Sequence, residues 1–339
     1  MAQRLELRQC TFRQPVDFGD STFTGPVVFE GGAFESRLTL SRSVFKLDLR
    51  FSTTCRSAAD FDDCVFEKRC KFLSEFHGVV NFNGSTFHEA AEFVGGWMHS
   101  SPGTLSQRDP PARYVFNDGV HLQLIDFRRP ERVQFRMVDL SRAFTLDTDF
   151  RKVRFYDIKW YQPILRRRGL YVEAWAKEGM VLQRFGPMLE ANYRNIRSAL
   201  EENKDFRGAT DFYVGEMEAR RRQLPLSRRY LLSIEWVYWL LSLYGASPLR
   251  ASGALVGVLV LYGMFSGCAL GTGCYSLSGG CHLDSDLVVR SLSLVEISKA
   301  PSGPELHGWW RFGEIVFRIF AVIQIALLAL ALRNRIKRT

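Results

Sequence analysis

A large apolar residue, most often phenylalanine, recurs every five or six positions through the first 93 residues of this 339-residue chain. An amphipathic strand repeats every two residues and an amphipathic helix every three or four, so neither element explains the spacing. The spacing is an internal repeat and leaves few folds open. The residues that we expect to form the core of this repeat include Phe23, Phe29, Phe34, Phe45, Phe66, Phe72 and Phe87.

A small or apolar residue stands two positions before each large one, as Val27 does before Phe29 and Cys70 before Phe72. Residues two apart share one face of an extended segment, so both can point inward. The chain must then turn between units, which predicts a β-solenoid with a narrow, filled interior and no cleft. A β-sandwich is the alternative, but its strands would show alternating runs of about four to eight residues.

A second run, "RVQFRMVDLSRAFTLDTDFRKVRF", restores the spacing with Phe135, Leu140, Phe150 and Phe155. Between the two runs, "HSSPGTLSQRDPPARY" is rich in proline, glycine and serine, which is typical of a loop. The sequence therefore predicts a solenoid over residues 1–156 with an inserted loop near residues 97–130.

These repeats resemble the pentapeptide-repeat proteins, whose five-residue units coil into a right-handed, four-sided β-helix. The resemblance covers residues 1–155, although the units here alternate between five and six residues and rarely show the family's Ala-Asp/Asn-Leu core. The segments "DLSRAF", "VRFYDIKW" and "YRNIR" with "GEMEARRR" resemble the linker of bacterial membrane-bound members. The resemblance implies a mixed β-solenoid and α-helical membrane protein, and it implies no particular activity.

The last third of the chain changes character. No charged residue lies between Arg250 and Asp284, and the run "ALVGVLVLYGMFSGCALGTGCY" inside that window is long enough to span a bilayer. A second run, residues 313–332, ends at "RNRIKR". A buried soluble helix is the alternative for this run, because it contains Glu314 and Arg318, but its pairing with the first run favours a span. We expect a two-span hairpin over residues 250–339 with an outer loop over residues 277–312.

The cationic residues predict the orientation of this hairpin. Three of them, Arg290, Lys299 and Arg311, lie between the spans, whereas larger groups precede the first span and follow the second. Cytoplasmic loops carry the excess of Lys and Arg, so both termini are expected in the cytoplasm of a cell with the hairpin in its inner membrane. The opening "MAQRLELRQCTF" lacks the apolar stretch of a signal peptide, so we expect the solenoid to stay in the cytosol.

The middle of the chain is basic, because residues 151–250 carry 19 Lys and Arg against 11 Asp and Glu. Apolar residues at helical spacing predict two amphipathic helices in a linker over residues 157–229, with a turn near residues 203–205 that Asp205 caps. The predicted apolar positions are Tyr193, Ile196 and Leu200, followed by Phe206, Ala209, Tyr213 and Met217. We expect this basic region to contact the anionic headgroups of membrane lipid.

Residues 230–249 mix tyrosine, tryptophan and leucine with a single Glu235. Amphipathic aromatic rings prefer the headgroup level of a membrane, which predicts an interfacial amphipathic helix lying on the cytoplasmic leaflet. A third span is the alternative, and Glu235 near the centre of the segment counts against it.

The motifs of catalysis are missing from the sequence. No Walker loop, dinucleotide-binding glycine pattern or nucleophile elbow is present, so we expect neither an enzyme nor a cofactor. Cys10, Cys64 and Cys70 occupy the small inward position of the repeat, where a thiol is a compact apolar filler. Cys274 and Cys281 lie in the predicted outer loop and could form a disulfide; a zinc site with His282 is the weaker alternative because it lacks a fourth ligand.

The charge of the solenoid argues against nucleic-acid functions. Residues 1–150 carry 18 Lys and Arg against 20 Asp and Glu, which is too balanced for the acidic surface by which some members of the resembled family imitate DNA. The basic residues lie instead beside aromatic residues that prefer a membrane, so we expect no nucleic-acid partner.

Two functions fit this organisation. The first is an oligomeric, channel-like pore, in which "DLVVRSLSLVEISKAPSGPE" folds back between the spans and Ser293, Glu296, Ser298 and Lys299 line the pore. No Gly-Tyr-Gly filter is present, so this pore would not select potassium as potassium channels do. The second is a membrane-anchored scaffold whose solenoid binds a cytosolic protein partner.

Overall fold

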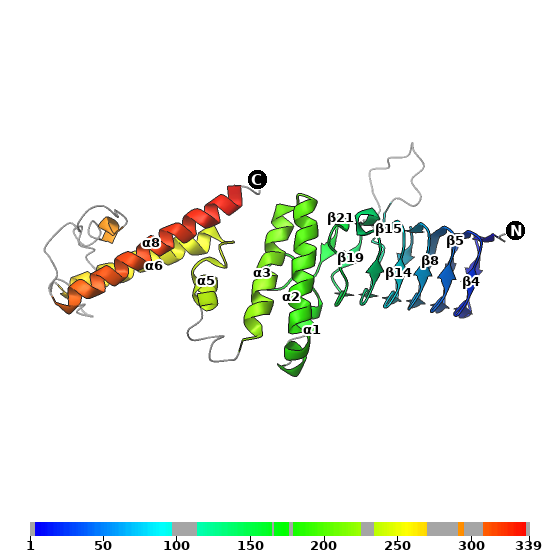
Figure 1. The fold of residues 1–339 in the computed structure, drawn as a ribbon, viewed down its shortest axis with the longest axis horizontal. Coiled ribbons are helices and arrows are strands. Elements are labelled where there is room, and N and C mark those ends of the chain that lie inside the picture. Colours follow the sequence, from blue (N-terminus) through cyan, green and yellow to red (C-terminus); the bar gives the residue numbers. More distant parts are fainter. Residues whose placement is uncertain are drawn as a thin grey trace. The chain divides into compact units, whose positions relative to one another are not determined.

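The computed structural model describes residues 4–96, 114–164, 166–175, 179–224, 234–269, 291–294 and 308–336. The chain divides into two compact units, Met1–Gln223 and Leu224–Thr339. The first unit holds a β-solenoid followed by the helices α1 to α3, and the second holds α5, α6 and α8 (Figure 1).

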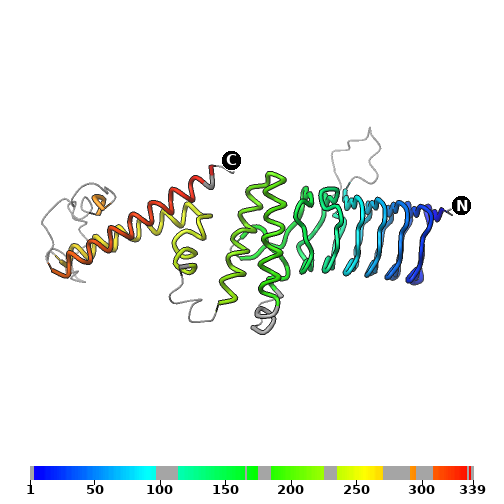
Figure 2. The backbone as a smooth tube through the Cα atoms, in the orientation of Figure 1, coloured from blue at the N-terminus to red at the C-terminus, as the bar shows by residue number. Residues whose placement is uncertain are grey.

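The solenoid is parallel and has about six turns, which Figure 2 shows as a row of stacked coils. Leu5 pairs with Val27, and Val27 pairs with Leu49, so the chain advances 22 residues in each of these turns. The next step, from Leu49 to Cys70, is 21 residues. Equivalent strands thus stack parallel to one another at a nearly constant advance, which confirms the solenoid predicted from the spacing.

Short strands stack along the solenoid in parallel ladders. The largest sheet has the order β1 (Leu5–Arg8), β5 (Val27–Phe34), β8 (Leu49–Cys55), β11 (Cys70–Phe72), β15 (Ala91–Val94), β18 (Val133–Arg136) and β21 (Arg154–Tyr156), with β2 (Thr11–Phe12) paired to β5 and β12 (Glu75–Phe76) paired to β8. A second has the order β20 (Ala143–Phe144), β16 (Val120–His121), β13 (Val80–Asn81), β9 (Ala59–Asp60), β6 (Leu38–Thr39) and β3 (Val16–Asp17). A third has the order β17 (Asp126–Phe127), β14 (Thr86–Phe87), β10 (Val65–Phe66), β7 (Val44–Phe45) and β4 (Thr22–Phe23), and β19 (Asp139–Leu140) pairs with β22 (Lys159–Trp160).

Phenylalanine rings fill the interior and stack from turn to turn. The ring centroids of Phe23 and Phe45 lie 4.8 Å apart, those of Phe45 and Phe66 5.1 Å, and those of Phe66 and Phe87 4.7 Å. These distances match the spacing of neighbouring strands, so each ring rests on its equivalent in the next turn. Of the expected core residues, Phe29, Phe34, Phe45, Phe66, Phe72 and Phe87 are buried, and Phe23 is partly buried in a strand that ends its ladder.

One corner of the solenoid takes the left-handed conformation in successive turns. The residues at this corner are Asp20, Arg42, Asp63, Gly84, Leu124 and Asp147, with φ from 52° at Asp63 to 68° at Gly84. The residue after the corner then bonds to an adjacent turn: Ser43 Oγ donates to the Phe18 carbonyl at 2.8 Å, and Cys64 Sγ donates to the Leu40 carbonyl at 3.0 Å. Cys64 is therefore more than the apolar filler that the sequence suggested.

The inserted loop is shorter than the predicted 97–130. Phe76 bridges to Phe116, and β16 and β17 pair with β13 and β14, so the solenoid has resumed by Val115. The loop is confined to residues between Val94 and Val115. The solenoid also continues past residue 156, because β22 pairs with β19.

Three helices, α1 (Val172–Trp175), α2 (Gly179–Glu202) and α3 (Phe206–Arg222), follow the solenoid. The ring of Trp160 meets Phe212 of α3 at 4.8 Å, and Asn203 Nδ2 donates to the Val153 carbonyl at 3.2 Å. The side chain of Asp205 accepts from the Gly208 amide at 2.9 Å, which confirms the predicted cap of α3. Residues 157–223 are thus no separate linker, because they share the solenoid's hydrophobic core.

The second unit contains α5 (Ile234–Ser242), α6 (Pro248–Ala269) and α8 (Trp309–Ile336). The predicted helix over 230–249 is wrong in its extent, because Leu243, Tyr244 and Gly245 all have φ between 51° and 72° and end α5. Nine residues of α5 are too short to cross a membrane. The Ser247 side chain accepts from the Arg250 amide at 3.3 Å, so α6 starts at a serine cap followed by proline, earlier than residue 250.

Candidate functional site

Helices α6 and α8 pack against each other through aromatic rings. The ring of Phe317 lies 5.6 Å from Tyr262 and 5.3 Å from Phe265. A Cβ on Gly313 would lie 2.3 Å from Cζ of Phe265, so the glycine admits this ring. Pro248–Ala269 and Trp309–Arg333 are both long and apolar enough to cross a membrane, with mean hydropathies of 1.7 and 2.6.

A short helical turn, Ser291–Leu294, packs onto this helix pair. Leu294 is buried in a cluster with Tyr262 of α6 and Ala321 of α8. Tyr262, which Leu294 contacts, lies seven residues before Ala269, the last residue given for α6, and is thus roughly 10 Å from it along the helix axis. Residues 291–294, which come between the two apolar helices in the sequence, therefore lie alongside them.

One of the four predicted pore-lining residues lies among the residues that the structure describes. Ser293 belongs to the helical turn and is buried, with 8 % of its surface exposed. The other three predicted lining residues, Glu296, Ser298 and Lys299, lie outside the described residues, as do Cys274 and Cys281 of the expected disulfide.

Gln324 is a buried polar residue of α8 that the sequence analysis did not single out. Its Nε2 donates to the Ala251 carbonyl at 2.7 Å, and the Leu241 carbonyl lies 3.4 Å away. Gln324 is 1 % exposed and joins α8 to α6 and to α5. A polar residue in the middle of an apolar run was the available signal, because such residues in membrane helices face a protein interior.

The most polar buried site in the first unit is an arginine–glutamate cluster between the solenoid and the helices. Arg166 pairs with Glu173 and, at 3.2 Å, with Glu218, and Arg222 pairs with Glu173 at 2.9 Å. Tyr193 Oη donates to Glu173 Oε2 at 2.7 Å and accepts from the Leu170 amide at 3.1 Å. The cluster joins the chain after β22 to α1, α2 and α3.

Two members of the cluster, Arg166 and Tyr193, have raised pKa values. Burial disfavours the charged form of Arg166, but Tyr193, Glu173 and Glu218 outweigh that effect and raise its pKa. Burial likewise raises the pKa of Tyr193, so its hydroxyl stays protonated. Two cations and two carboxylates around a protonated tyrosine hold the helices in place and offer no nucleophile.

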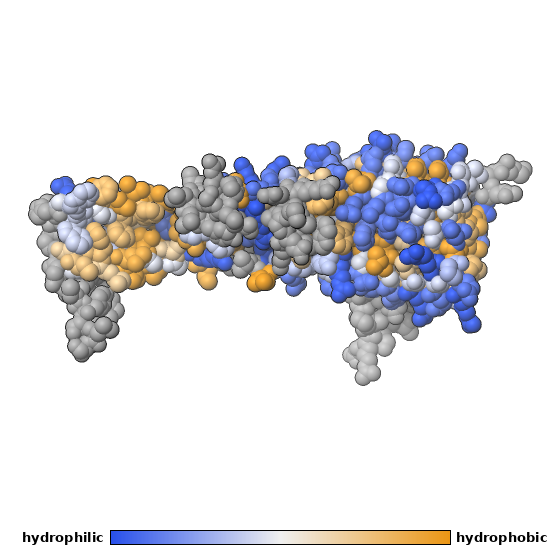
Figure 3. Space-filling view, turned by 90° about the horizontal axis from the view of Figure 1, so that it is seen from below, coloured by the Kyte–Doolittle hydropathy of each residue, from blue (hydrophilic) through white to orange (hydrophobic). Residues whose placement is uncertain are grey.

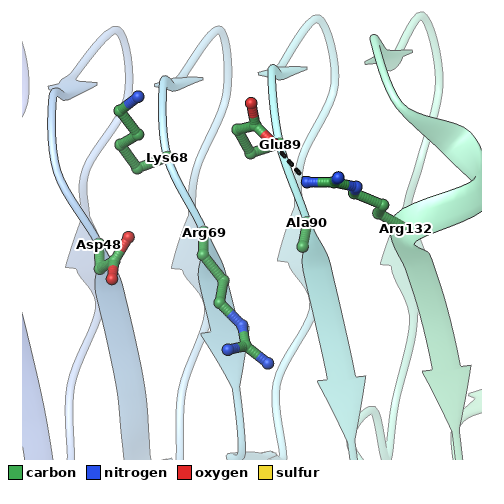
Figure 4. A pocket seen from close by; sticks show the side chains of 6 residues that line it. All are labelled: Asp48, Lys68, Arg69, Glu89, Ala90 and Arg132. Atoms are coloured by element: carbon green, nitrogen blue, oxygen red, sulfur yellow. Dashed lines mark hydrogen bonds and ion pairs between the residues drawn. The ribbon is translucent and has the colours of Figure 1, made fainter.

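The outer surface of the solenoid carries ion pairs between turns and a depression. Figure 4 shows this depression, with Glu89 directed toward Arg132. The residues that line it come from successive turns and are Asp48, Lys68, Arg69, Glu89, Ala90 and Arg132. Among the described residues, no group of three or more His, Cys, Asp and Glu side chains could hold a metal ion.

A parallel β-solenoid joined to two helices that are apolar enough for a membrane defines the class of protein. Residues 7–54 match the family model described as pentapeptide repeats (9 copies). These repeats, the β-solenoid and the two apolar helices together fit a membrane-bound pentapeptide-repeat protein. No curated protein and no solved structure matches the chain.

Proposed function

We propose that the chain is one subunit of an oligomeric, channel-like membrane pore, whose pentapeptide-repeat solenoid senses or binds a partner in the cytoplasm. The observation that carries this proposal is the placement of residues 291–294 beside α6 and α8, where Leu294 packs against Tyr262 and Ala321. An anchor needs only two spans, whereas re-entrant chain between spans is tolerated where it lines a water-filled cavity or is buried in protein.

The proposal requires several copies of the chain to assemble around one pore. Backbone that is not helical is tolerated at membrane depth only where protein or water satisfies its polar groups. The residues after Leu294, which include the polar Glu296, Ser298 and Lys299, would meet this condition around a wet central axis. A ring of Glu296 would attract cations, and Lys299 would weaken that preference.

The proposed location is the inner membrane of a bacterium, with both termini in the cytoplasm. This orientation is supported by the positions of Lys and Arg: few lie between the two apolar helices, and many lie before the first helix and after the second. This orientation leaves the solenoid in the cytoplasm.

Single-channel recording of the purified full chain in planar bilayers tests the proposal. In a salt gradient, Glu296→Gln should move the reversal potential toward zero and lower the permeability ratio of cations to anions by about twofold or more, because the carboxylate ring is lost. Glu305→Gln, in the same inter-helix segment, is the matched control and should leave the reversal potential unchanged. Native mass spectrometry should find the same oligomer for all three proteins.

A membrane-anchored scaffold is the second candidate. The observation in its favour is the outer surface of the solenoid, where charged side chains such as Arg42 and Asp20 pair between turns and are exposed to a protein partner. If oligomers of the wild-type chain conduct no ions, the pore proposal is wrong and the scaffold takes its place. If they conduct but Glu296→Gln has no effect, the assigned lining is wrong.

A further inference from the structure

The outward face of α3 carries an apolar stripe that the fold does not use for its core. Phe206, Tyr213 and Met217 recur at helical spacing on one side, where Phe206 is 43 % exposed and the other two are partly exposed. The opposite side, with Phe212, Gly215 and Ala219, is buried. The apolar face predicted from the sequence is therefore only partly packed, because Ala209 is buried, Tyr213 and Met217 are partly buried and Phe206 is exposed.

Cations flank this stripe. Arg207 and Arg220 are exposed, and neither forms an ion pair with any residue within the described ranges. The guanidinium of Arg197 lies 5.6 Å from the centre of the Tyr213 ring while Nη1 of the same residue binds Glu216. The face therefore combines apolar side chains with positive charge.

The rest of the basic region is less available, because carboxylates already hold much of its charge. The cations of residues 151–223 that pair within the unit include Arg151, Lys159, Arg166, Arg168, Arg194, Arg197 and Arg222. The excess positive charge expected from composition thus reaches the surface at positions such as Arg207 and Arg220.

We propose that this face of α3, the stripe of Phe206, Tyr213 and Met217 with Arg207 and Arg220, binds the surface of an anionic lipid bilayer. Apolar side chains beside Lys and Arg are the composition of helices that lie in the headgroup region. Residues 224–247 also tether α3 to Pro248 at the start of α6, which raises its effective concentration at the membrane. The inference rests on the proposed function only in requiring that α6 and α8 cross the membrane.

Photocrosslinking of the full chain tests the inference. p-Benzoylphenylalanine replaces Met217, and the protein is reconstituted in vesicles of phosphatidylcholine with phosphatidylglycerol or of phosphatidylcholine alone. Mass spectrometry should find lipid adducts at position 217 in the anionic vesicles. The same probe in place of Leu47, an exposed apolar residue of the solenoid, is the control and should give no lipid adduct. Adducts at position 217 to a second copy or to the chain's own residues instead of lipid would overturn the inference.

Charge reversal gives a second, independent measurement. Arg207→Glu with Arg220→Glu should lower the lipid adduct at position 217 by about tenfold or more, since each cation at an anionic surface contributes about 1 kcal/mol. Arg37→Glu, at an exposed position of the solenoid, should leave it unchanged. An unchanged adduct in the double variant overturns the inference. Ion flux through the same vesicles separates this inference from the proposed function. A protein that conducts ions but gives no lipid adduct overturns the inference and leaves the pore proposal standing. A protein that alkaline washing removes from the vesicles does not cross the membrane, which contradicts both the inference and the pore proposal.

Discussion

The solenoid and the hairpin place their apolar side chains in opposite directions. In the solenoid, Phe61, Phe72 and Phe82 are completely buried, and the surface carries ion pairs such as Arg42 with Asp20. In the hairpin, Val256, Val260 and Ile319 are each more than half exposed. Only 22 % of the most apolar stretch of α6 and 17 % of that of α8 are buried. Figure 3 shows apolar residues gathered on the surface of this unit.

This difference shows that composition alone does not separate the two units, because both are rich in large apolar residues. The arrangement of those residues does separate them. The solenoid repeats one inward position every five or six residues and keeps polar residues between, whereas the hairpin is apolar on all sides of its helices. A helix that is apolar all round and exposed suits a lipid environment.

The largest effect is expected from placing a charge inside the solenoid. Phe45→Asp puts a carboxylate between the rings of Phe23 and Phe66, where nothing can pair with it, and should cost several kcal/mol and unfold the solenoid. Circular dichroism of the purified full chain would follow this as a lost thermal transition.

Val44→Asp is the control for Phe45→Asp, because Val44 is its neighbour in β7 but is only partly buried. Its melting temperature should stay close to that of the wild type. Equal losses from both substitutions would contradict the inward and outward alternation that distinguishes the solenoid from the hairpin.

A smaller effect, of opposite sign at two positions, is expected in the hairpin. Gly313→Ala brings a Cβ to 2.3 Å from the Phe265 ring and should destabilise the helix pair by about 1–3 kcal/mol. Gly257→Ala has nothing within 4 Å and should gain about 1 kcal/mol of helix propensity. Thermal unfolding in detergent micelles, followed by tryptophan fluorescence, would measure both. Stabilisation by both alanines would mean that α6 and α8 do not pack through Phe265.

The sequence was sufficient to predict the solenoid, because each repeat unit is only five or six consecutive residues long. The spacing of Phe29, Phe34 and Phe45 already specifies which side chains point inward. The end of the inserted loop was less visible, because Val115 and Phe116 follow a proline-rich segment and regain the register only by pairing with a turn 40 residues earlier. Long-range register of this kind has no local signal.

The candidate sites depended more on the structure. The helical turn at Ser293 was expected from the mixed polar and apolar segment between the two spans. The contact of the neighbouring Leu294 with Tyr262 depends on tertiary packing, which the sequence does not show. Arg166 and Glu218 are 52 positions apart, so their buried pair could not be inferred from spacing. The outward stripe of α3 was hidden because Ala209 and Tyr213 share one apolar face, and the spacing does not tell which part of that face the rest of the fold covers.

The smallest perturbation, one that leaves the fold intact, tests the interior of the solenoid through its thiols. Cys55, Cys64 and Cys70 are buried, whereas Cys10 is partly exposed in the first turn. Burial raises the pKa of Cys64 to about 12, so at pH 8 only about one such thiol in ten thousand is a thiolate, which is the reactive form.

Iodoacetamide at pH 8 should therefore modify Cys10 and leave Cys55, Cys64 and Cys70 unmodified, as peptide mass spectrometry of the native full chain would show. Urea should make all four react, because unfolding exposes the thiols and returns each pKa to its ordinary value. The hairpin offers the contrast, since Cys268 is exposed on α6 and is protected only where lipid or detergent covers it. Modification of Cys64 as fast as Cys10 without denaturant would show that water enters the solenoid, and the separation between a dry interior and a lipid-facing exterior would then fail.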